Sequence, residues 1–100
     1  MNLKEIEQKL KQIIDGYSEK FAIKRDDDWY VLKIQEELGE LTAAHLKLTQ
    51  RGRVVDKSKD ELEKNLREEI ADVIAMTILF AQHKGIDIEK ALQDKWFKHL

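Results

Sequence analysis

Residues 70–81 read IADVIAMTILFA, and this stretch indicates the fold class. It is apolar on almost every side of a helix, with Asp72 as its only charge and Thr77 as its only uncharged polar residue. A helix of this kind is usually buried on most of its sides. Because burying an isolated carboxylate is costly, we expect Asp72 to be paired, protonated or bound to a metal ion.

The helix that contains this stretch has recognisable ends in the sequence. Ser58 and Glu61 form a Ser-x-x-Glu capping box, which predicts that a helix starts after Ser58. Gly85 follows the last apolar residues of the periodic pattern and predicts that the helix stops just before it. Asp87 then suits the N-cap of a final helix that continues toward Leu100.

Two further amphipathic helices are predicted upstream, at about 2–15 and 28–50, from apolar residues at spacings of three and four. Gly16 is expected to end the first helix, and residues 17–27 are expected to be irregular. No stretch alternates apolar and polar residues for long enough to be a strand. The sequence therefore predicts an all-α fold, a four-helix bundle-like domain that spans residues 1–100.

Composition excludes several classes of protein. The 100 residues include 42% hydrophobic residues, which is too apolar for a disordered chain. The net charge of -2 shows no basic excess, so we expect no nucleic-acid polymer as a partner. The chain has no cysteine, no apolar leader and no long apolar run. We therefore expect a cytoplasmic protein without membrane contact.

Acidic residues interrupt the amphipathic pattern of the second predicted helix. Glu37 and Glu40 are three residues apart at the edge of its apolar stripe, where their side chains are neighbours. Gly39 lies in the same turn, although a mid-helix glycine costs about 1 kcal/mol, which suggests close approach of another helix or a ligand. Taken alone, this pair is more typical of a solvated helix face. His45 lies in the apolar stripe, where we expect a hydrogen-bonded core or interface residue.

A second acidic pair, Glu69 and Asp72, has the same spacing on the third predicted helix. If the two helices pack antiparallel, four carboxylates converge, and such a cluster requires divalent cations. Oxygen ligands suit the hard ions Mg²⁺ or Mn²⁺. A ferritin-like di-iron site is the rival, but neither pair has a histidine at the required position.

These residues resemble the signature of MazG-like, all-α nucleoside triphosphate pyrophosphohydrolases. The resemblance rests on Glu36-Glu37-x-x-Glu40 and Glu69-x-x-Asp72 with their flanking residues, and on GIDIEKAL at 85–92. It covers about residues 31–95. It implies Mg²⁺-dependent hydrolysis of a (deoxy)nucleoside triphosphate between the α and β phosphorus atoms, which yields the monophosphate and pyrophosphate.

The resemblance also implies roles for individual residues. Glu37, Glu40, Glu69 and Asp72 would be the Mg²⁺ ligands, and Glu36 would orient or deprotonate the attacking water. Lys33 and Lys95 are candidates for contacts to the phosphates, with Arg51 and Arg53 as weaker ones; solvent-facing charge is the alternative for each. Trp29 and Tyr30 could stack on a base, although aromatic residues at a helix start are more often part of the core.

Two other functions remain open at this stage. One is hydrolysis of phosphoribosyl-ATP, which uses similar acidic motifs, and the other is a helical interaction module without chemistry. We also expect self-association into a dimer or tetramer. A single layer of four helices would leave Ile74, Ile78 or Leu79 facing water.

Overall fold

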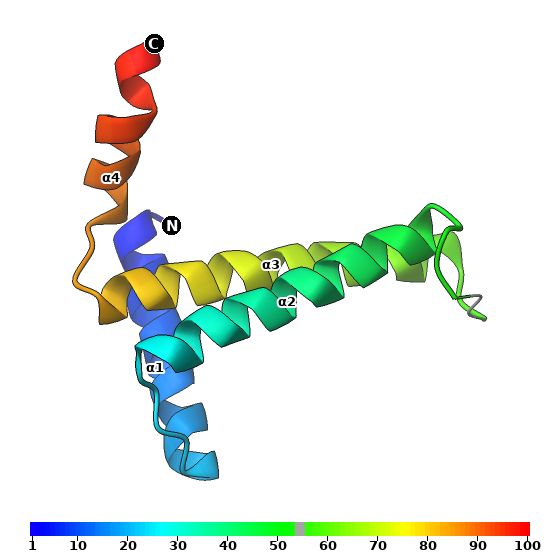
Figure 1. Cartoon of the computed structure of the whole chain (residues 1–100), viewed down its shortest axis with the longest axis horizontal. Coiled ribbons are helices and arrows are strands. Elements are labelled where there is room, and N and C mark those ends of the chain that lie inside the picture. The colour runs from blue at the N-terminus through cyan, green and yellow to red at the C-terminus, as the bar shows by residue number, and fades with distance from the viewer. Residues whose placement is uncertain (54–55) are drawn as a thin grey trace.

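The computed structural model describes residues 1–53 and 56–100, and this part of the chain is helical without any strand. It contains α1 (Leu3–Phe21), α2 (Asp27–Leu48), α3 (Lys59–His83) and α4 (Ile88–Lys95), followed by the short 3-10 helix η1 (Phe97–His99) (Figure 1). The predictions of an all-α fold and of four helices are therefore confirmed.

Each α-helix begins where the sequence supplies a capping oxygen. The side chains of Asn2, Asp26, Ser58 and Asp87 each accept a hydrogen bond from the backbone N–H three residues on, at 2.8–3.2 Å. Such caps satisfy one of the free N–H groups at a helix start. The predicted caps at Ser58 and Asp87 are confirmed, and among the three consecutive aspartates Asp26 takes this role.

The first helix is longer than the sequence predicted. It continues through Gly16 to Phe21 and ends at Ala22, which adopts a left-handed conformation with φ of 52°. The expected stop at Gly16 and the irregular segment from residue 17 were therefore wrong. A mid-helix glycine costs only about 1 kcal/mol, and the turn that follows it packs the Tyr17 ring against the Phe21 ring, with centroids 4.8 Å apart.

Gly85 ends α3 as predicted. Its φ of +66° lies in the left-handed region that glycine adopts without strain. The N–H groups of Gly85 and Ile86 donate to the carbonyl oxygens of Gln82 and Ala81, which closes the helix. The last helix is shorter than predicted, because α4 ends at Lys95 and a single 3-10 turn follows it.

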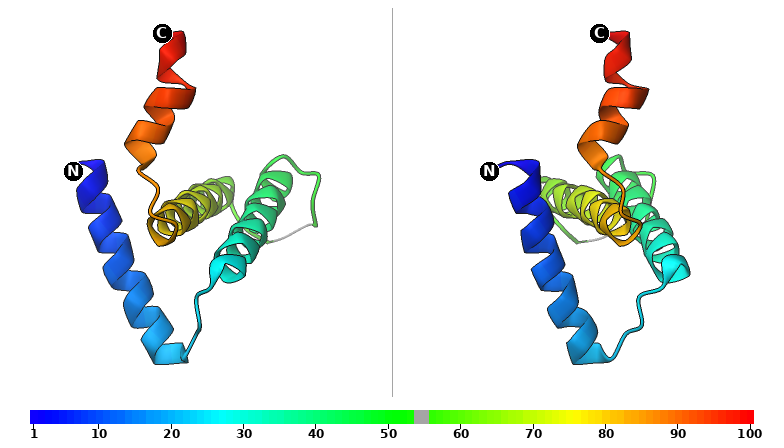
Figure 2. Two further views of the ribbon diagram at one scale, coloured as in Figure 1. Left: turned by 60° about the vertical axis from the view of Figure 1, so that its left-hand side comes forward. Right: turned by 90° about the vertical axis from the view of Figure 1, so that its left-hand side faces the viewer.

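The centre of the molecule is an antiparallel hairpin of α2 and α3, which pack against each other along their lengths (Figure 1). α1 crosses one end of this hairpin and packs against α3 (Figure 2). The small core lies at this crossing, where Ile14 meets Tyr30, Met76 and Leu79. The core thus fixes α1 on α3, while the other end of the hairpin extends beyond it.

Ion pairs join the segments around the core. The Arg25 guanidinium donates to the Asp15 carboxylate at 2.6 Å and to the Tyr30 hydroxyl at 3.0 Å. Asp27, at the start of α2, contacts His83 Nε2 at 2.7 Å and accepts from Lys84 Nζ at 2.9 Å at the end of α3. These contacts connect the start of α2 to both neighbouring helices.

α4 projects from the end of α3 and lies apart from the α2–α3 hairpin (Figures 1 and 2). It has no buried residue, and Leu92, Trp96 and Phe97 expose large apolar surfaces. Among the described residues, no helix is long and apolar enough to cross a membrane.

Candidate metal centre

Two turns of helix position the four acidic side chains that the sequence singles out. Glu37 and Glu40 lie in the middle of α2, and Glu69 and Asp72 lie in the middle of α3. A spacing of three residues places both members of each pair on one side of their helix. Because α2 and α3 are packed antiparallel, the two pairs meet across the hairpin.

The carboxylates form one cluster. Each of the four residues offers an oxygen atom, and these oxygens all lie within 4.8 Å of one another. Two ligands on opposite sides of one Mg²⁺ are about 4.2 Å apart, given Mg–O distances of 2.0–2.1 Å. Small side-chain rotations would therefore bring the four oxygens around a single hard cation.

Two carboxylate oxygens in the cluster are buried without a partner. They are Oε2 of Glu37 and Oε2 of Glu69, and each lacks a hydrogen bond. A buried polar atom without a partner is costly and calls for an explanation. Glu40 and Asp72 are exposed, so the cluster is open to solvent on one side. A cation that entered from that side would satisfy both buried oxygens.

The electrostatics of the cluster are unfavourable to the ionised acids. Burial, followed by the neighbouring charges of Glu40 and Asp72, raises the pKa of Glu37 to about 7. Burial also raises the pKa of Glu69, with Glu40 as the next cause. Both shifts follow from placing like charges in a partly desolvated site. A bound divalent cation would reverse them by favouring the ionised form.

Asp72 does not occupy the environment that the sequence predicted. The side chain is exposed in this chain, so the expectation of a buried lone charge was wrong. The reason is that α1 covers only part of α3, which leaves this side of the helix open near Asp72. The neighbouring Ile74 is 54% exposed, because the part of α3 on which it lies is also left uncovered. Ile78 and Leu79, further along the helix, are buried.

Glu36 and Lys33 lie beside the cluster as an ion pair. The Lys33 ammonium donates to Oε1 of Glu36 at 2.8 Å, and this bond raises the pKa of Lys33. Glu37 and Tyr17 raise it further, so both are close to the same ammonium group. The sequence did not single out Tyr17, because Gly16 was expected to end the helix on which Tyr17 lies.

The other residues that the sequence proposed for substrate binding do not all lie near the acidic cluster. Trp29 is half-buried against the core, edge-on to Tyr30 with ring centroids 5.0 Å apart. Tyr30 is 4% exposed and belongs to the core. Lys95 lies at the end of α4, which stands away from the middle of the hairpin (Figure 1). Arg51 contacts Thr49 in the α2–α3 loop. The structure thus places Trp29 near the start of α2 but does not bring Lys95 to the acids.

Of two sequence-based expectations about α2, a core position for His45 was wrong, and no other helix of this chain makes the close approach expected at Gly39. His45 is exposed, 3.4 Å from an Arg51 nitrogen, rather than part of the core. A Cβ at Gly39 would meet no atom within 4 Å, so no helix of this chain approaches it closely. The face of α2 that packs on α3 is centred on Ile34, Leu41 and Ala44 instead, which turns His45 toward solvent.

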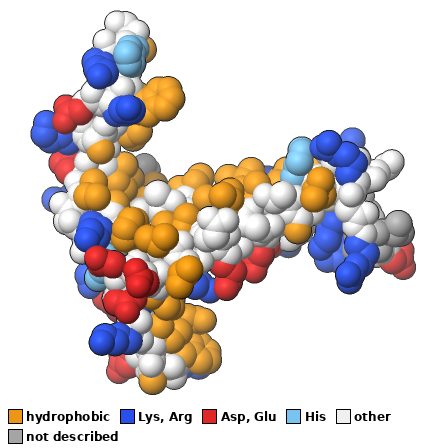
Figure 3. Space-filling view, in the orientation of Figure 1, with side chains coloured by type: hydrophobic (Ala, Val, Ile, Leu, Met, Phe, Trp, Pro, Cys, Tyr) orange, Lys and Arg blue, Asp and Glu red, His pale blue; other side chains and the backbone are white. Residues whose placement is uncertain are grey.

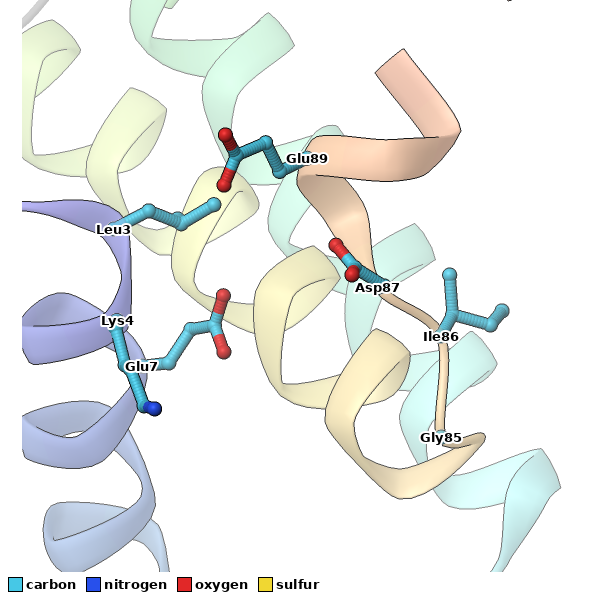
Figure 4. A pocket seen from close by; sticks show the side chains of 7 residues that line it. All are labelled: Leu3, Lys4, Glu7, Gly85, Ile86, Asp87 and Glu89. Carbon is cyan, nitrogen blue, oxygen red and sulfur yellow. The ribbon is translucent and has the colours of Figure 1, made fainter. Parts of the chain in front are cut away.

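A cavity lies away from the acidic cluster, between the start of α1 and the turn after α3 (Figure 4). Its volume is about 420 Å³. It is lined by Leu3, Lys4, Glu7, Gly85, Ile86, Asp87 and Glu89. These residues do not include any of the four clustered acids, and volume alone is a weaker guide to chemistry than converging charged groups.

Comparison with models of known protein families, with curated proteins and with solved structures gives no match for this chain. The acidic cluster and the motif in which its residues occur are therefore the features of this chain that point to a function.

Proposed function

We propose that this protein is a Mg²⁺-dependent pyrophosphohydrolase that cleaves a (deoxy)nucleoside triphosphate between its α and β phosphorus atoms. The observation that supports it most is the cluster of four carboxylates within 4.8 Å of one another, with two buried oxygens that lack partners. The motif around these acids, which resembles that of MazG-like enzymes, supports the same reaction. Mn²⁺ is the alternative cation, because it prefers similar oxygen ligands.

Glu37, Glu40, Glu69 and Asp72 would hold the cation at the open side of the cluster. When bound, Mg²⁺ offsets the charge of the phosphate oxygens and makes a nearby water more acidic. The reaction needs positioning and charge neutralisation more than covalent help from the protein. An acidic site without a cation would repel the polyanionic substrate, which is why the metal and the substrate belong to one proposal.

Glu36 is the residue that we assign to the attacking water. It is next to the cluster, its side chain is 55% exposed, and its only ion pair is with Lys33 among the described residues. Its carboxylate would accept a proton from the water as the oxygen attacks phosphorus, and the P–O bond to the leaving pyrophosphate would break. The Lys33 ammonium would then leave the Glu36 carboxylate and pair with a phosphate oxygen of the substrate instead.

Trp29 extends this site along α2. Trp29, Lys33, Glu36 and Glu40 are spaced by four, three and four residues, so they lie in one row on the helix surface. Trp29 and Glu36 are seven residues apart, which corresponds to about 10 Å along a helix. A nucleotide bound along this row would place its base against the indole and its phosphates beside the acids. Lys95 lies on α4, away from the acids in this chain, so its contact with the phosphates stays a prediction.

A substrate panel tests the proposal. Purified protein is incubated with the common ribo- and deoxyribonucleoside triphosphates and with phosphoribosyl-ATP, with Mg²⁺ or with a chelator, and pyrophosphate is measured. We expect release from at least one nucleoside triphosphate, only with the metal. Release from phosphoribosyl-ATP alone would favour that alternative. Release from none of the substrates, together with no Mg²⁺ binding by calorimetry, would leave a helical interaction module.

Glu36→Gln separates catalysis from metal binding. We expect turnover to fall by about 10² or more, as for loss of a general base, while Mg²⁺ affinity persists. Glu37→Gln should lose both. Glu63→Gln is the matched control, because Glu63 is an acid on α3 outside the cluster. Equal loss of metal binding in Glu36→Gln and Glu37→Gln would show that the two roles are misassigned.

A further inference from the structure

Lysine and arginine side chains gather at the end of the α2–α3 hairpin where the chain turns from α2 into α3 (Figure 3). Residues 47–59 include five of the chain's 18 lysines and arginines but only one of its 20 acids, Asp56. The net charge of -2 for the whole chain therefore conceals a local basic surface. We call its five residues the basic tip, and they are Lys47, Arg51, Arg53, Lys57 and Lys59.

Acids of the chain do not neutralise the basic tip. In the part of the chain that the structure describes, Lys59 is the one member with an ion pair, to Glu63 at 4.0 Å. The Arg51 guanidinium contacts the Thr49 hydroxyl at 3.1 Å and His45 Nε2 at 3.4 Å, and neither group is an anion. These cations are therefore available to an anion from outside the chain.

Helix dipoles explain some of these charges and not others. Lys47 and Arg51 lie at the carboxyl end of α2, where a cation is favourable. Lys57 and Lys59 lie at the amino end of α3, where free N–H groups already make the surroundings positive and a cation is unfavourable. Helix starts of this polarity commonly bind anions. The two lysines at the start of α3 are therefore explained better by a bound anion than by the stability of the helix.

A cavity of about 380 Å³ lies between the two ends of these helices. It is lined by Lys47, Leu48, Gln50, Lys57, Lys59 and Leu62. Three of these described residues are lysines and none is acidic, although Asp60 and Glu61 lie in the same turn of α3 as Lys59. The volume falls within the range of small-molecule sites, about 300–1,000 Å³. The lysines of the basic tip thus surround a space that a small anion can enter.

The backbone of the loop holds one wall of this cavity in place. Gln50 adopts a left-handed conformation with φ of 61°. The N–H groups of Arg51 and Gly52 both donate to the Leu46 carbonyl oxygen, at 2.8 and 3.0 Å. A Cβ at Gly52 would lie 3.2 Å from the backbone nitrogen of Lys47, so the loop packs directly on the last turn of α2. These contacts fix the positions of Lys47 and Gln50 relative to each other.

We propose that this cavity is a second ligand site, which binds a phosphate chain, such as that of a nucleotide or of an inorganic polyphosphate, without a metal ion. Its three ammonium groups can donate charge-assisted hydrogen bonds to phosphate oxygens. Leu48 and Leu62 provide an apolar wall for the rest of a ligand.

The cavity is separate from the acidic cluster. Lys47 is seven residues from Glu40, which corresponds to about 10 Å along α2. Because the cavity uses none of the four acids, phosphate binding there is independent of the proposed hydrolysis.

Calorimetric titration with tripolyphosphate in metal-free buffer tests this site. Without a cation the acidic cluster repels anions, so binding under these conditions reports the basic tip. The chelator used to remove metal is dialysed away first, because it is itself a polyanion. We expect saturable binding at low salt that weakens as the salt concentration rises, since salt screens exposed charges. Absence of binding at low salt would overturn the proposal.

Glutamine substitutions assign the binding to the cavity. Lys57→Gln and Lys47→Gln remove one ammonium group from each side of it, and each should weaken binding by about tenfold, as expected for loss of a hydrogen bond to a charged group. Lys90→Gln is the matched control, because Lys90 is an exposed lysine on α4 outside the cavity. An equal loss in all three variants would show an effect of net charge alone and overturn the site. Circular dichroism checks that each variant is helical.

A comparison of ligands identifies the source of the phosphate chain. Tighter binding of adenosine triphosphate than of tripolyphosphate would support the site and indicate a nucleotide that uses the apolar wall. Equal or weaker binding of the nucleotide would support the site and indicate an inorganic chain. A short single-stranded RNA or anionic phospholipid vesicles that bind the protein while tripolyphosphate does not would overturn the proposal, because the basic tip would then be a surface for a larger polyanion.

Discussion

Glu37→Gln should stabilise this protein without metal and destabilise it with metal. Glu37 has a buried oxygen without a hydrogen-bond partner, in a cluster of like charges. Glutamine keeps the size of the side chain and removes its charge. In a chelator the substitution therefore relieves desolvation and repulsion, whereas with Mg²⁺ it removes a ligand that the wild-type chain would use.

The size of the effect follows from the pKa of Glu37. Its pKa rises from an ordinary 4.5 to about 7 in the folded chain, and each pKa unit is worth about 1.36 kcal/mol. The rise corresponds to about 3 kcal/mol, and solvent screening at the open side of the cluster reduces the expected gain to about 1–2 kcal/mol. In a chain of this length, each kcal/mol of stability raises Tm by about 4–8 °C.

The dependence on pH has a definite sign. Because the folded pKa of Glu37 is raised, its favourable contribution is fully present below about pH 4.5 and is lost as the pH rises through about 7. Without metal, the wild-type chain should therefore lose stability between these values. Glu37→Gln should lose less, so the two curves should lie close together in acid and separate above neutral pH.

Thermal unfolding followed by circular dichroism measures these differences, with both proteins at one concentration because association shifts Tm. Scans are run at several pH values, first with a chelator and then with excess Mg²⁺. Glu63→Gln controls for the loss of a helical acid outside the cluster. Lower stability of Glu37→Gln than of the wild type in the chelator above pH 7, or equal stabilisation of both proteins by Mg²⁺, would contradict the role given to Glu37.

Three further predictions concern the scaffold. Asp27→Asn should lower stability to urea at pH 7 and have little effect near about pH 2. The reason is that Lys84, and then His83, hold the pKa of Asp27 below its usual value. An equal loss of stability at both pH values would contradict this prediction. Gly16→Ala should raise the free energy of unfolding by about 0.5–1 kcal/mol, since Gly16 lies inside α1 with free space around it. Gly85→Ala should lower the free energy of unfolding by about 1 kcal/mol, since φ is +66° at Gly85. Equal effects of the two alanine substitutions would disprove the assignment of these backbone conformations.

Local signals were enough to predict the helices and the members of the acidic cluster. Ser58 and Asp87 marked two helix starts, because a capping oxygen acts on its own next turn. The two acidic pairs were recognisable because a spacing of three residues places side chains together on any helix. Their convergence needed one further step, the antiparallel packing of α2 on α3, which the short connection between the helices favours.

Gly16 shows where local signals fail. A glycine after an amphipathic segment is a common stop, yet here α1 continues for another turn and a half beyond it. α1 is held against α3 by contacts between residues that are far apart in the sequence, such as Ile14 with Met76 and Leu79, and a local stop signal does not report them. His45 was misplaced for a similar reason, since the pattern of apolar residues in α2 does not say which of two neighbouring rows meets α3.

The class of fold, the helix starts and the four acids can be predicted from the sequence, since each depends on periodicity or on groups within a turn of one another. Which sides of those helices are covered depends on how the folded chain packs. That packing places Glu37 and Glu69 partly inside the hairpin, leaves Asp72 exposed and keeps α4 away from the site. Burial depends on the packing of distant segments, and α1 crosses only one end of the α2–α3 hairpin (Figure 2).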